Sequence, residues 1–441
     1  MEAVIPMENT IGEKIKLLRK ELKMTQAELA GSEMTKSMLS QIENNQAAPS
    51  MKSLQYIAQR LGKSPSFFLD NEKENIPVDD INKKLNKIDK LIKNFEYASA
   101  REKIEKILSA YSYDKDNKLY ADILYKYGEC LQDMLEFDSG EEKIKEAVKI
   151  YTGLHLTTYA ARANMELIRR YYNEYNYDEC LKILDESWNM YKHAVNHDSL
   201  LEIEMLFYRS LVKLADASAE EVLELIQKAL DISNENGAYY KSDELYRLKA
   251  LVYFVMEKYN DFLFCIKKAK QFAQFSDNYK SLSKIEISLA MYENALNNPE
   301  NAIEHLKKFD KFNGKRNFGY YANLSLSYYL LKNYKEAYAN ILKINYKPQM
   351  YHKIDYFMLW TGKVYEGLIL NKLNKTEKAI DSINFAINKL EFFDDSKYLA
   401  FAYKSLSDIY AEKGNYEKAY AAIKKAYDIR NILVKEGKIA Y

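Results

Sequence analysis

Glycine and proline are scarce in this chain of 441 residues, which holds only 13 Gly and 6 Pro. β-Sheets need frequent turns, and turns favour these two residue types, so their scarcity excludes most β-rich folds. No run approaches 18 apolar residues, which excludes an ordinary membrane-spanning helix. The sequence therefore predicts a protein built almost entirely of helices, with no membrane partner.

Cysteine is also rare. The three cysteines, Cys130, Cys180 and Cys265, are odd in number and far apart, which argues against a disulfide framework and favours a reducing compartment. The first residues, MEAVIPMENT, lack the basic and apolar regions of a signal peptide. We therefore expect a cytoplasmic protein, whose translation could begin at Met1 or at Met7.

Motifs of catalysis and metal binding are missing from the sequence. It contains no P-loop, no GxGxxG after a predicted strand and no GxSxG. His193 and His197 lie one helical turn apart, but no Glu follows the first and no third ligand is evident, so a solvated pair is the simpler interpretation. We expect no catalytic residue, no metal and no cofactor, and a protein that is not an enzyme.

The charge balance is close to neutral, with a formal net charge of +1. A nucleic-acid binder of this composition would depend on local charge placement and on the pairing of two copies. The length is too great for one ordinary core and suggests two or more units, or an extended array.

The stretch TQAELAGSEMTKSMLSQIENN is typical of two short helices joined by a tight turn. Thr25 and Glu28 have the spacing of a capping box at a helix start. Residues 31–34 form the turn, and Thr35 caps a second helix that runs to about Asn44. We expect the rest of the chain to control this stretch.

The second of these helices has two distinct faces. Three apolar side chains share one face by their spacing: Met38, Leu39 and Ile42. Three polar side chains with the same spacing share another: Ser37, Gln41 and Asn44. Such side chains can read base-pair edges in the major groove, where Gln suits adenine and Lys suits guanine. This favours a DNA-reading helix over an ordinary amphipathic surface helix.

Apolar periodicity predicts three more helices around this pair. A first helix runs from about Thr10 to Lys23, with one apolar stripe: Ile11, Ile15, Leu18 and Leu22. A fourth is capped by Ser50 and turns four residues inward: Leu54, Ile57, Ala58 and Leu61. A short fifth begins at Ser64 and Pro65 and closes the core with three residues: Phe67, Phe68 and Leu69.

The run from IGEKIKLLRKELKMTQAELA through MLSQIENN, APS and LQYIAQRLG resembles the lambda-repressor/Cro-type helix-turn-helix domain over residues 10–70. Its shortened turn, GSEMTKSMLSQIE, is similar to that of a subset, the peptide-sensing RRNPP regulators of Gram-positive bacteria. Asn45 stands where the family usually has Gly. The resemblance implies seven DNA-binding residues: Gln26, Thr35 and Asn44 at phosphates, Lys36, Ser37 and Gln41 at base edges, and Asn45 in the loop.

Beyond residue 70 the chain changes character. Residues 71–80 are charged, contain a Pro and have no apolar period, which predicts a linker. From residue 81 to residue 441 the chain repeats at intervals of roughly 40 residues. Nine helix starts mark the copies: Tyr97, Asp138, Tyr177, Glu220, Tyr259, Pro299, Tyr334, Thr376 and Tyr416.

Each of these helices carries a narrow seam of small or apolar residues at i, i+4 and i+7, as at Ala419, Ile423 and Ala426. The last copy, AFAYKSLSDIYAEKGNYEKAYAAIKKAY, resembles a tetratricopeptide repeat, although the repeat length also fits HEAT-type repeats. About nine stacked hairpins predict a right-handed superhelix with a concave inner face. The fold class is therefore all-α, with a five-helix DNA-binding domain (1–70), a linker (71–80) and a repeat domain (81–441) for peptide binding and dimerisation.

Carrying the pattern of the last repeat to the others turns five polar residues inward: Arg162, Arg169, Asn173, Arg247 and Asn294. Asn offers a donor and an acceptor to the backbone of an extended peptide, and Arg can bind a carboxylate with two bonds. The alternative is that these are ordinary polar residues on a wet surface.

Together, the two parts resemble the RRNPP regulators over essentially the whole chain. The resemblance implies a homodimeric transcription factor on a two-fold double-stranded DNA operator. Its repeat domain would bind a short signalling peptide, as in quorum sensing, and control DNA binding allosterically. Two alternatives stay open: a repeat-scaffold adaptor for a response regulator or other protein partner, with DNA binding secondary, and a regulator tuned by oligomerisation alone.

Overall fold

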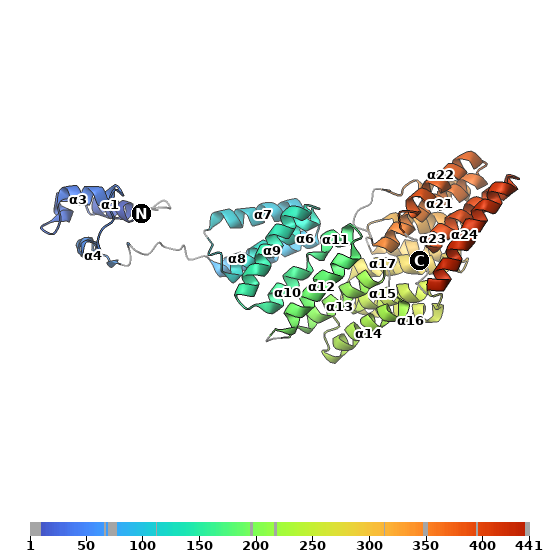
Figure 1. Ribbon diagram of the computed structural model, residues 1–441, viewed down its shortest axis with the longest axis horizontal. Helices are drawn as coiled ribbons and strands as arrows, with labels where there is room; N and C mark the ends of the chain where they lie inside the picture. Colours follow the sequence, from blue (N-terminus) through green and yellow to red (C-terminus); the bar gives the residue numbers. More distant parts are fainter. Residues whose placement is uncertain are drawn as a thin grey trace. The chain divides into compact units, whose positions relative to one another are not determined.

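The computed structural model describes residues 10–65, 68, 77–111, 113–194, 197–215, 218–312, 314–346, 352–393 and 396–436. Within these ranges all regular secondary structure is helical, which confirms the all-α prediction (Figure 1). The chain forms two compact units, Met1–Asp114 and Lys115–Tyr441. None of the helices in the described ranges is both long and apolar enough to span a membrane.

Four helices build the predicted DNA-binding domain of the first unit: α1 (Ile11–Glu21), α2 (Gln26–Ala30), α3 (Lys36–Glu43) and α4 (Met51–Arg60). The predicted caps are confirmed, because Thr25, Thr35 and Ser50 each accept a hydrogen bond from the backbone three residues on. Thr25 and Glu28 complete the expected capping box. The predicted fifth helix lies mostly outside the described residues, although Phe68 is buried as expected.

The core of this domain agrees with the sequence pattern at most positions. It is formed by side chains from all four helices: Ile15, Leu18, Leu29, Leu39, Ile42, Leu54, Ile57, Ala58 and Leu61. Two predictions of inward residues were wrong. Leu22 is exposed because it is the C-cap residue beyond the last turn of α1. Met38 is exposed because the buried stripe of α3 runs through Leu39, Ile42 and Glu43.

Nine helical hairpins follow in the described residues. The first, α6 (Val78–Lys93) with α7 (Tyr97–Ala110), belongs to the first unit, and α6 begins within the predicted linker. The second unit contains the other eight: α8 (Lys118–Asp133) with α9 (Phe137–Gly153), α10 (Thr157–Met165) and α11 (Ile168–Asn173) with α12 (Tyr177–Lys192), α13 (Ser199–Lys213) with α14 (Ala219–Glu235), α15 (Ser242–Val255) with α16 (Tyr259–Phe275), α17 (Tyr279–Ala295) with α18 (Pro299–Lys311), α19 (Phe318–Leu330) with α20 (Tyr334–Ile341), α21 (Lys353–Lys372) with α22 (Thr376–Leu390), and α23 (Lys397–Glu412) with α24 (Tyr416–Glu436).

The hairpins match the repeat pattern of the sequence. The nine predicted starts coincide, to within one residue, with the starts of the second helices. From α15 to α23 the first helices of successive hairpins pack on one another, so they form one layer of the stack. The three cysteines are buried in this unit, and no disulfide joins them.

The turns inside the hairpins explain how the chain manages with so little glycine. In four of the hairpins, the residue that follows the C-cap of the first helix adopts a left-handed conformation. Its φ is 66° at Leu135, 59° at Tyr175, 58° at Lys332 and 77° at Gly414. Each turn is closed by a six-to-one backbone bond, such as that from the amide of Asn333 to the carbonyl oxygen of Tyr328, three residues before the C-cap Leu331. Only one of these four positions is Gly, so non-glycine residues bear the strain.

The start of α21 contacts helices far back in the sequence. His352 donates from Nε2 to the carbonyl oxygen of Leu211 at 3.0 Å, because its Nδ1 accepts from the backbone of Ile354. The hydroxyl of Tyr177 accepts from the backbone N–H of Lys353 at 2.8 Å. We call these two bonds the α21 contact, which ties α21 to α12 and α13.

Candidate functional site

The predicted DNA-reading helix, α3, is fixed by a buried ion pair. The carboxylate of Glu43, only 1% exposed, accepts from Arg19 on α1 through both oxygens, at 2.6 and 3.0 Å. Gln26 at the start of α2 donates to the same carboxylate at 2.8 Å. Burial raises the pKa of Glu43, but the hydrogen bonds from Arg19 and Gln26 and the charge of Arg19 outweigh it, and the pKa lies below its usual value. Three helices are thereby locked together.

Close contact between α1 and α3 adds to this anchoring. A Cβ atom at Gly12 would lie 2.1 Å from the carbonyl oxygen of Ile42, so only glycine allows this approach. Lys16 donates to the side chain of Asn44 at 3.1 Å. The orientation of α3 is therefore set by α1 as much as by the turn before it.

The outward face of α3 carries the residues that the sequence predicts for base contacts. Lys36, Ser37 and Gln41 are exposed, and Thr35 is exposed at the cap. Gln26 is half-buried and its amide nitrogen is held by Glu43. Their contacts with DNA stay a prediction.

Asn45 ends α3 in the conformation that glycine usually supplies. Its φ is 58°, and the amide of Gln46 closes the turn on the carbonyl oxygen of Gln41 at 2.8 Å. Asn tolerates the left-handed region better than other non-glycine residues. The loop backbone is therefore built with Asn45 in the place of the family's Gly.

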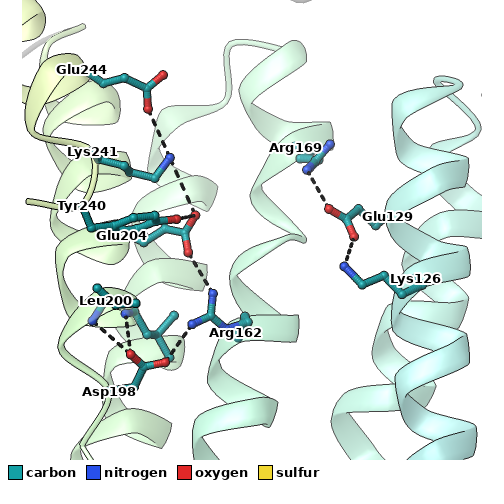
Figure 2. Close-up of polar contacts among 11 residues, drawn as sticks. Lys126, Glu129, Arg162, Arg169, Asp198, Leu200, Glu204, Tyr240, Lys241 and Glu244 are labelled. Carbon is teal, nitrogen blue, oxygen red and sulfur yellow. Dashed lines mark hydrogen bonds and ion pairs between the residues drawn. The ribbon is translucent and has the colours of Figure 1, made fainter. Parts of the chain in front are cut away.

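In the second unit, charged side chains meet between the helices α8 to α15 (Figure 2). We call the following residues the polar cluster: Lys126, Glu129, Asp133, Arg162, Glu166, Arg169, Asp198, Glu204, Lys241 and Glu244. Arg162 on α10 donates to Asp198 at 2.9 Å and to Glu204 at 3.0 Å. Lys241 lies 3.3 Å from Glu244 and 3.8 Å from Glu204. These contacts link three successive hairpins, and the residues on α8 extend the cluster to a fourth.

Arg169 on α11 is surrounded by carboxylates. It donates to Glu166 and to Asp133, and Glu129 lies 3.9 Å away. Burial is the main cause that raises the pKa of Glu129, and it also raises the pKa of Asp133. These side chains are nevertheless partly accessible, with 11–23% exposure from Glu166 to Arg169. A polar ligand can therefore reach them while much of the bulk water is excluded.

Arg162 and Arg169 lie on two different helices, α10 and α11, although they are only seven residues apart. The chain tightens between α10 and α11, where the amide of Leu167 bonds to Asn164 at 3.0 Å and that of Arg169 to Glu166 at 3.2 Å, each three residues back. Both arginines still reach the polar cluster. Asn173, at the end of α11, is half-buried.

Arg247 on α15 and Lys284 on α17 extend the charged surface beyond the cluster. The Nε atom of Arg247 is buried without a hydrogen-bond partner in the described part of the chain. The charge of Arg247, followed by burial, lowers the pKa of Lys284 to about 8. On α21, burial raises the pKa of Asp355, although Arg247 and Lys284 oppose that rise. A carboxylate or phosphate placed here would be stabilised by two cations.

Asn294, the remaining predicted ligand residue, is buried between α17 and α19. Its amide nitrogen donates to the carbonyl oxygen of Asn323 at 3.0 Å, and its oxygen accepts from Ser327 at 2.8 Å. Its hydrogen-bonding groups are therefore engaged within the scaffold.

The sequence analysis missed the carboxylates that face the arginines: Asp133, Glu166, Asp198, Glu204 and Asp355. Only Glu166 had a local signal, because it precedes Arg169 by three residues. The others come from different hairpins.

Two further features concern other kinds of site. In the described residues no group of His, Cys, Asp or Glu could hold a metal ion. An apolar cavity of about 200 Å³ lies between α12, α13 and α14, and none of its lining residues belongs to the polar cluster.

Comparison with known proteins supports the two-part architecture. Residues 15–68 match a family model described as helix-turn-helix. No curated protein matches the chain. A Rap protein complexed with Competence and Sporulation Factor is 15% identical, with a TM-score of 0.56 over 81% of this chain and 99% of that one. The apo form of RapI is 17% identical, with a TM-score of 0.53 over 81% and 99%.

A third solved structure is more distant. PlcR of Bacillus thuringiensis, in complex with the peptide PapR7 and DNA, is 17% identical, with a TM-score of 0.38 over 61% of this chain and 96% of that one. The chain thus joins a segment that matches a helix-turn-helix model to helical repeats with the fold of the Rap proteins.

Proposed function

We propose that this protein is a transcriptional regulator that binds double-stranded DNA through α3 and a short signalling peptide through its repeat domain. One observation carries the proposal: the same chain joins a rigidly held, outward polar helix to a charged surface on which the Nε atom of Arg247 has no hydrogen-bond partner among the described residues. The first feature suits a DNA operator, and the second suits a small anionic ligand.

At the DNA, Lys36, Ser37 and Gln41 would contact base edges from the exposed face of α3. The phosphates would be held by Gln26, Thr35 and Asn44, and the loop at Asn45 would approach the DNA backbone. The nearly neutral chain makes one copy a weak binder, so two copies on a two-fold operator are proposed.

At the repeat domain, the ligand residues would be Arg162, Arg169, Asn173 and Arg247. The carboxylate of a peptide would lie between Arg247 and Lys284. The charge of Arg247 lowers the pKa of Lys284 there, because the nearby carboxylates offset it only in part. A Rap protein of the same fold binds Competence and Sporulation Factor, which supports a signalling ligand. Asn294 would hold α17 against α19 rather than contact the peptide.

Ligand binding would act through the ion pairs of the polar cluster. A peptide carboxylate that competes for Arg169 releases Asp133 or Glu166, which belong to different hairpins. The spacing of α8 and α11 would then change, and allosteric control follows if the two spacings favour different arrangements of the DNA-binding domains.

The DNA proposal is tested by selection from random duplexes with the full-length chain. We expect enrichment of a two-fold sequence, and an insertion of about five base pairs between its halves should weaken binding by placing them on opposite sides of the duplex. Enrichment of no sequence would refute DNA reading.

The ligand proposal is tested with random heptapeptides selected on the full-length chain. The selected peptide is then compared by calorimetry with a free and with an amidated C-terminus. Arg247→Ala should weaken the free acid more than the amide. Equal losses for both would remove the carboxylate from this position.

The adaptor alternative is favoured by the apolar cavity between α12 and α14, which a side chain of a protein partner could fill. Under that alternative, Trp188→Ala would abolish partner binding and leave peptide binding unchanged.

A further inference from the structure

The last helix of the stack, α24, exposes an apolar stripe. One of its faces is buried on α23 through small and aliphatic residues: Ala419, Ala422, Ala426, Ile429 and Leu433. A second face carries Tyr416, Tyr420, Ile423 and Tyr427, which are 73%, 69%, 40% and 65% exposed. Terminal repeats normally turn a polar face outward, so this end of the stack is unusual.

The preceding hairpin shows what this stripe is shaped to receive. Forty residues earlier, α22 has Ile380, Ile383 and Ile387 at the positions of Tyr420, Ile423 and Tyr427. There the three side chains are 8%, 0% and 6% exposed, and α23 packs on α22. The exposed stripe of α24 is therefore a stacking surface on which another helix belongs.

The spacing of the stripe makes it complementary to itself. Positions 416, 420, 423 and 427 are separated by four, three and four residues, which reads the same in both directions. Two antiparallel copies of α24 would place Tyr416 opposite Tyr427 of the partner subunit, and Tyr420 opposite Ile423 of the partner subunit. Such a two-fold, isologous contact closes on itself and adds no further copies.

The charges beside the stripe fit the same arrangement. Glu417 and Lys424 are both exposed and lie two helical turns apart along one edge of the stripe. In the antiparallel pair, Glu417 would fall beside Lys424 of the partner subunit, and the reverse contact forms by symmetry. A parallel two-fold pair would instead put this edge of the two helices on opposite sides of the contact, so Glu417 would not meet Lys424 of the partner subunit.

We infer that α24 is a self-association surface through which two copies of this chain pack with antiparallel helices. This deepens the proposed function, because it places the contact between the two copies in the repeat domain. The inference needs no DNA for its test, so it can fail while DNA binding by one copy stands.

The test is sedimentation equilibrium of the full-length chain over a range of concentrations. The parent should dimerise, and Tyr420→Glu should raise the dissociation constant by at least about tenfold, because it buries a charge opposite an isoleucine. Phe275→Ala is the matched control, since Phe275 is an exposed aromatic residue of another hairpin. It should leave the constant unchanged.

A charge swap makes the test independent of any damage to packing. Glu417→Lys alone and Lys424→Glu alone should each weaken the dimer. Each variant places like charges beside each other in both of the symmetry-related contacts between positions 417 and 424. The double variant should return to within about threefold of the parent. A monomeric parent, an unaffected Tyr420→Glu, or a double variant no better than its singles would each overturn the inference.

Discussion

Arg247 on α15 is the largest cause of the lowered pKa of Lys284 on α17, which falls to about 8. The two cations thus repel each other, and neutralising either one would relieve the repulsion. Such an arrangement costs stability, and a charged ligand is one way to recover it.

Peptide affinity should therefore depend on pH in the range where Lys284 titrates. The ammonium is charged below pH 8 and neutral above it, so binding of a free C-terminal carboxylate should weaken by about tenfold from pH 7 to pH 9. Calorimetry on the parent and on Lys284→Met measures this. The variant should bind more weakly at pH 7 with a flatter profile, and its fold should be no less stable because an unfavourable charge is removed. Identical pH profiles for the two proteins would contradict the prediction.

Glu43→Gln should unfold the DNA-binding domain selectively. The change leaves Arg19 buried without its counter-charge, which typically costs about 3–5 kcal/mol. Hydrogen exchange of peptides from residues 10–65 measures the loss, and Glu28→Gln at the exposed capping box is the control with a much smaller effect. Because the folded pKa of Glu43 is lowered, its contribution is present above the unfolded pKa and is lost as the pH falls through the folded pKa. The parent should therefore lose protection of this domain in acid, and the variant should show less of that dependence.

Gln41→Ala should reduce the free energy of binding to the selected operator by about 1–3 kcal/mol and relax the preference for one base pair. Its side chain is exposed on the outer face of α3 and is not needed for the core. Titration of labelled duplexes with each base substituted in turn gives both quantities. Gln59→Ala, exposed on α4, serves as the control. Unchanged affinity and unchanged preference would show that α3 does not read the bases through this residue.

Lys332→Gly should stabilise the repeat domain. Lys332 has a φ of 58°, and glycine removes a left-handed strain of about 1 kcal/mol, part of which is offset by the greater freedom of glycine in the unfolded chain. Lys267→Gly in the middle of α16 should instead lower the free energy of unfolding by about 1 kcal/mol. Chemical denaturation followed by circular dichroism compares the two. Opposite signs are expected, and a loss in both would show that Lys332 makes contacts worth more than its strain.

Local features were predictable because they depend on neighbours in the sequence. The caps at Thr25, Thr35 and Ser50 follow from the hydrogen bonds that a helix start needs, and the second-helix starts follow from small-residue seams. Leu22 was misplaced because α1 ends at the residue before it, and Met38 was misplaced because a spacing of three or four residues does not decide which of two adjacent stripes is buried.

Contacts between hairpins were not predictable. Asn294 has the composition of a ligand residue, and its burial depends on Asn323 and Ser327, which lie in the next hairpin. The break between α10 and α11 contains neither Gly nor Pro, so nothing in the sequence indicates it. Arg162 and Arg169 could be selected from the repeat pattern, but their carboxylate partners could not.

The α21 contact changes the mechanics of the stack. In a stack where each hairpin contacts only its neighbours, each contact between two hairpins can deform independently of the others. The hydrogen bonds from His352 to Leu211 and from Lys353 to Tyr177 join the start of α21 to α13 and α12. The helices between them, α13 to α20, therefore lie within a closed loop of contacts. Strain at any junction of this loop of contacts is therefore shared by the others, and the last hairpin, α23 with α24, packs on α21 and α22 outside the loop.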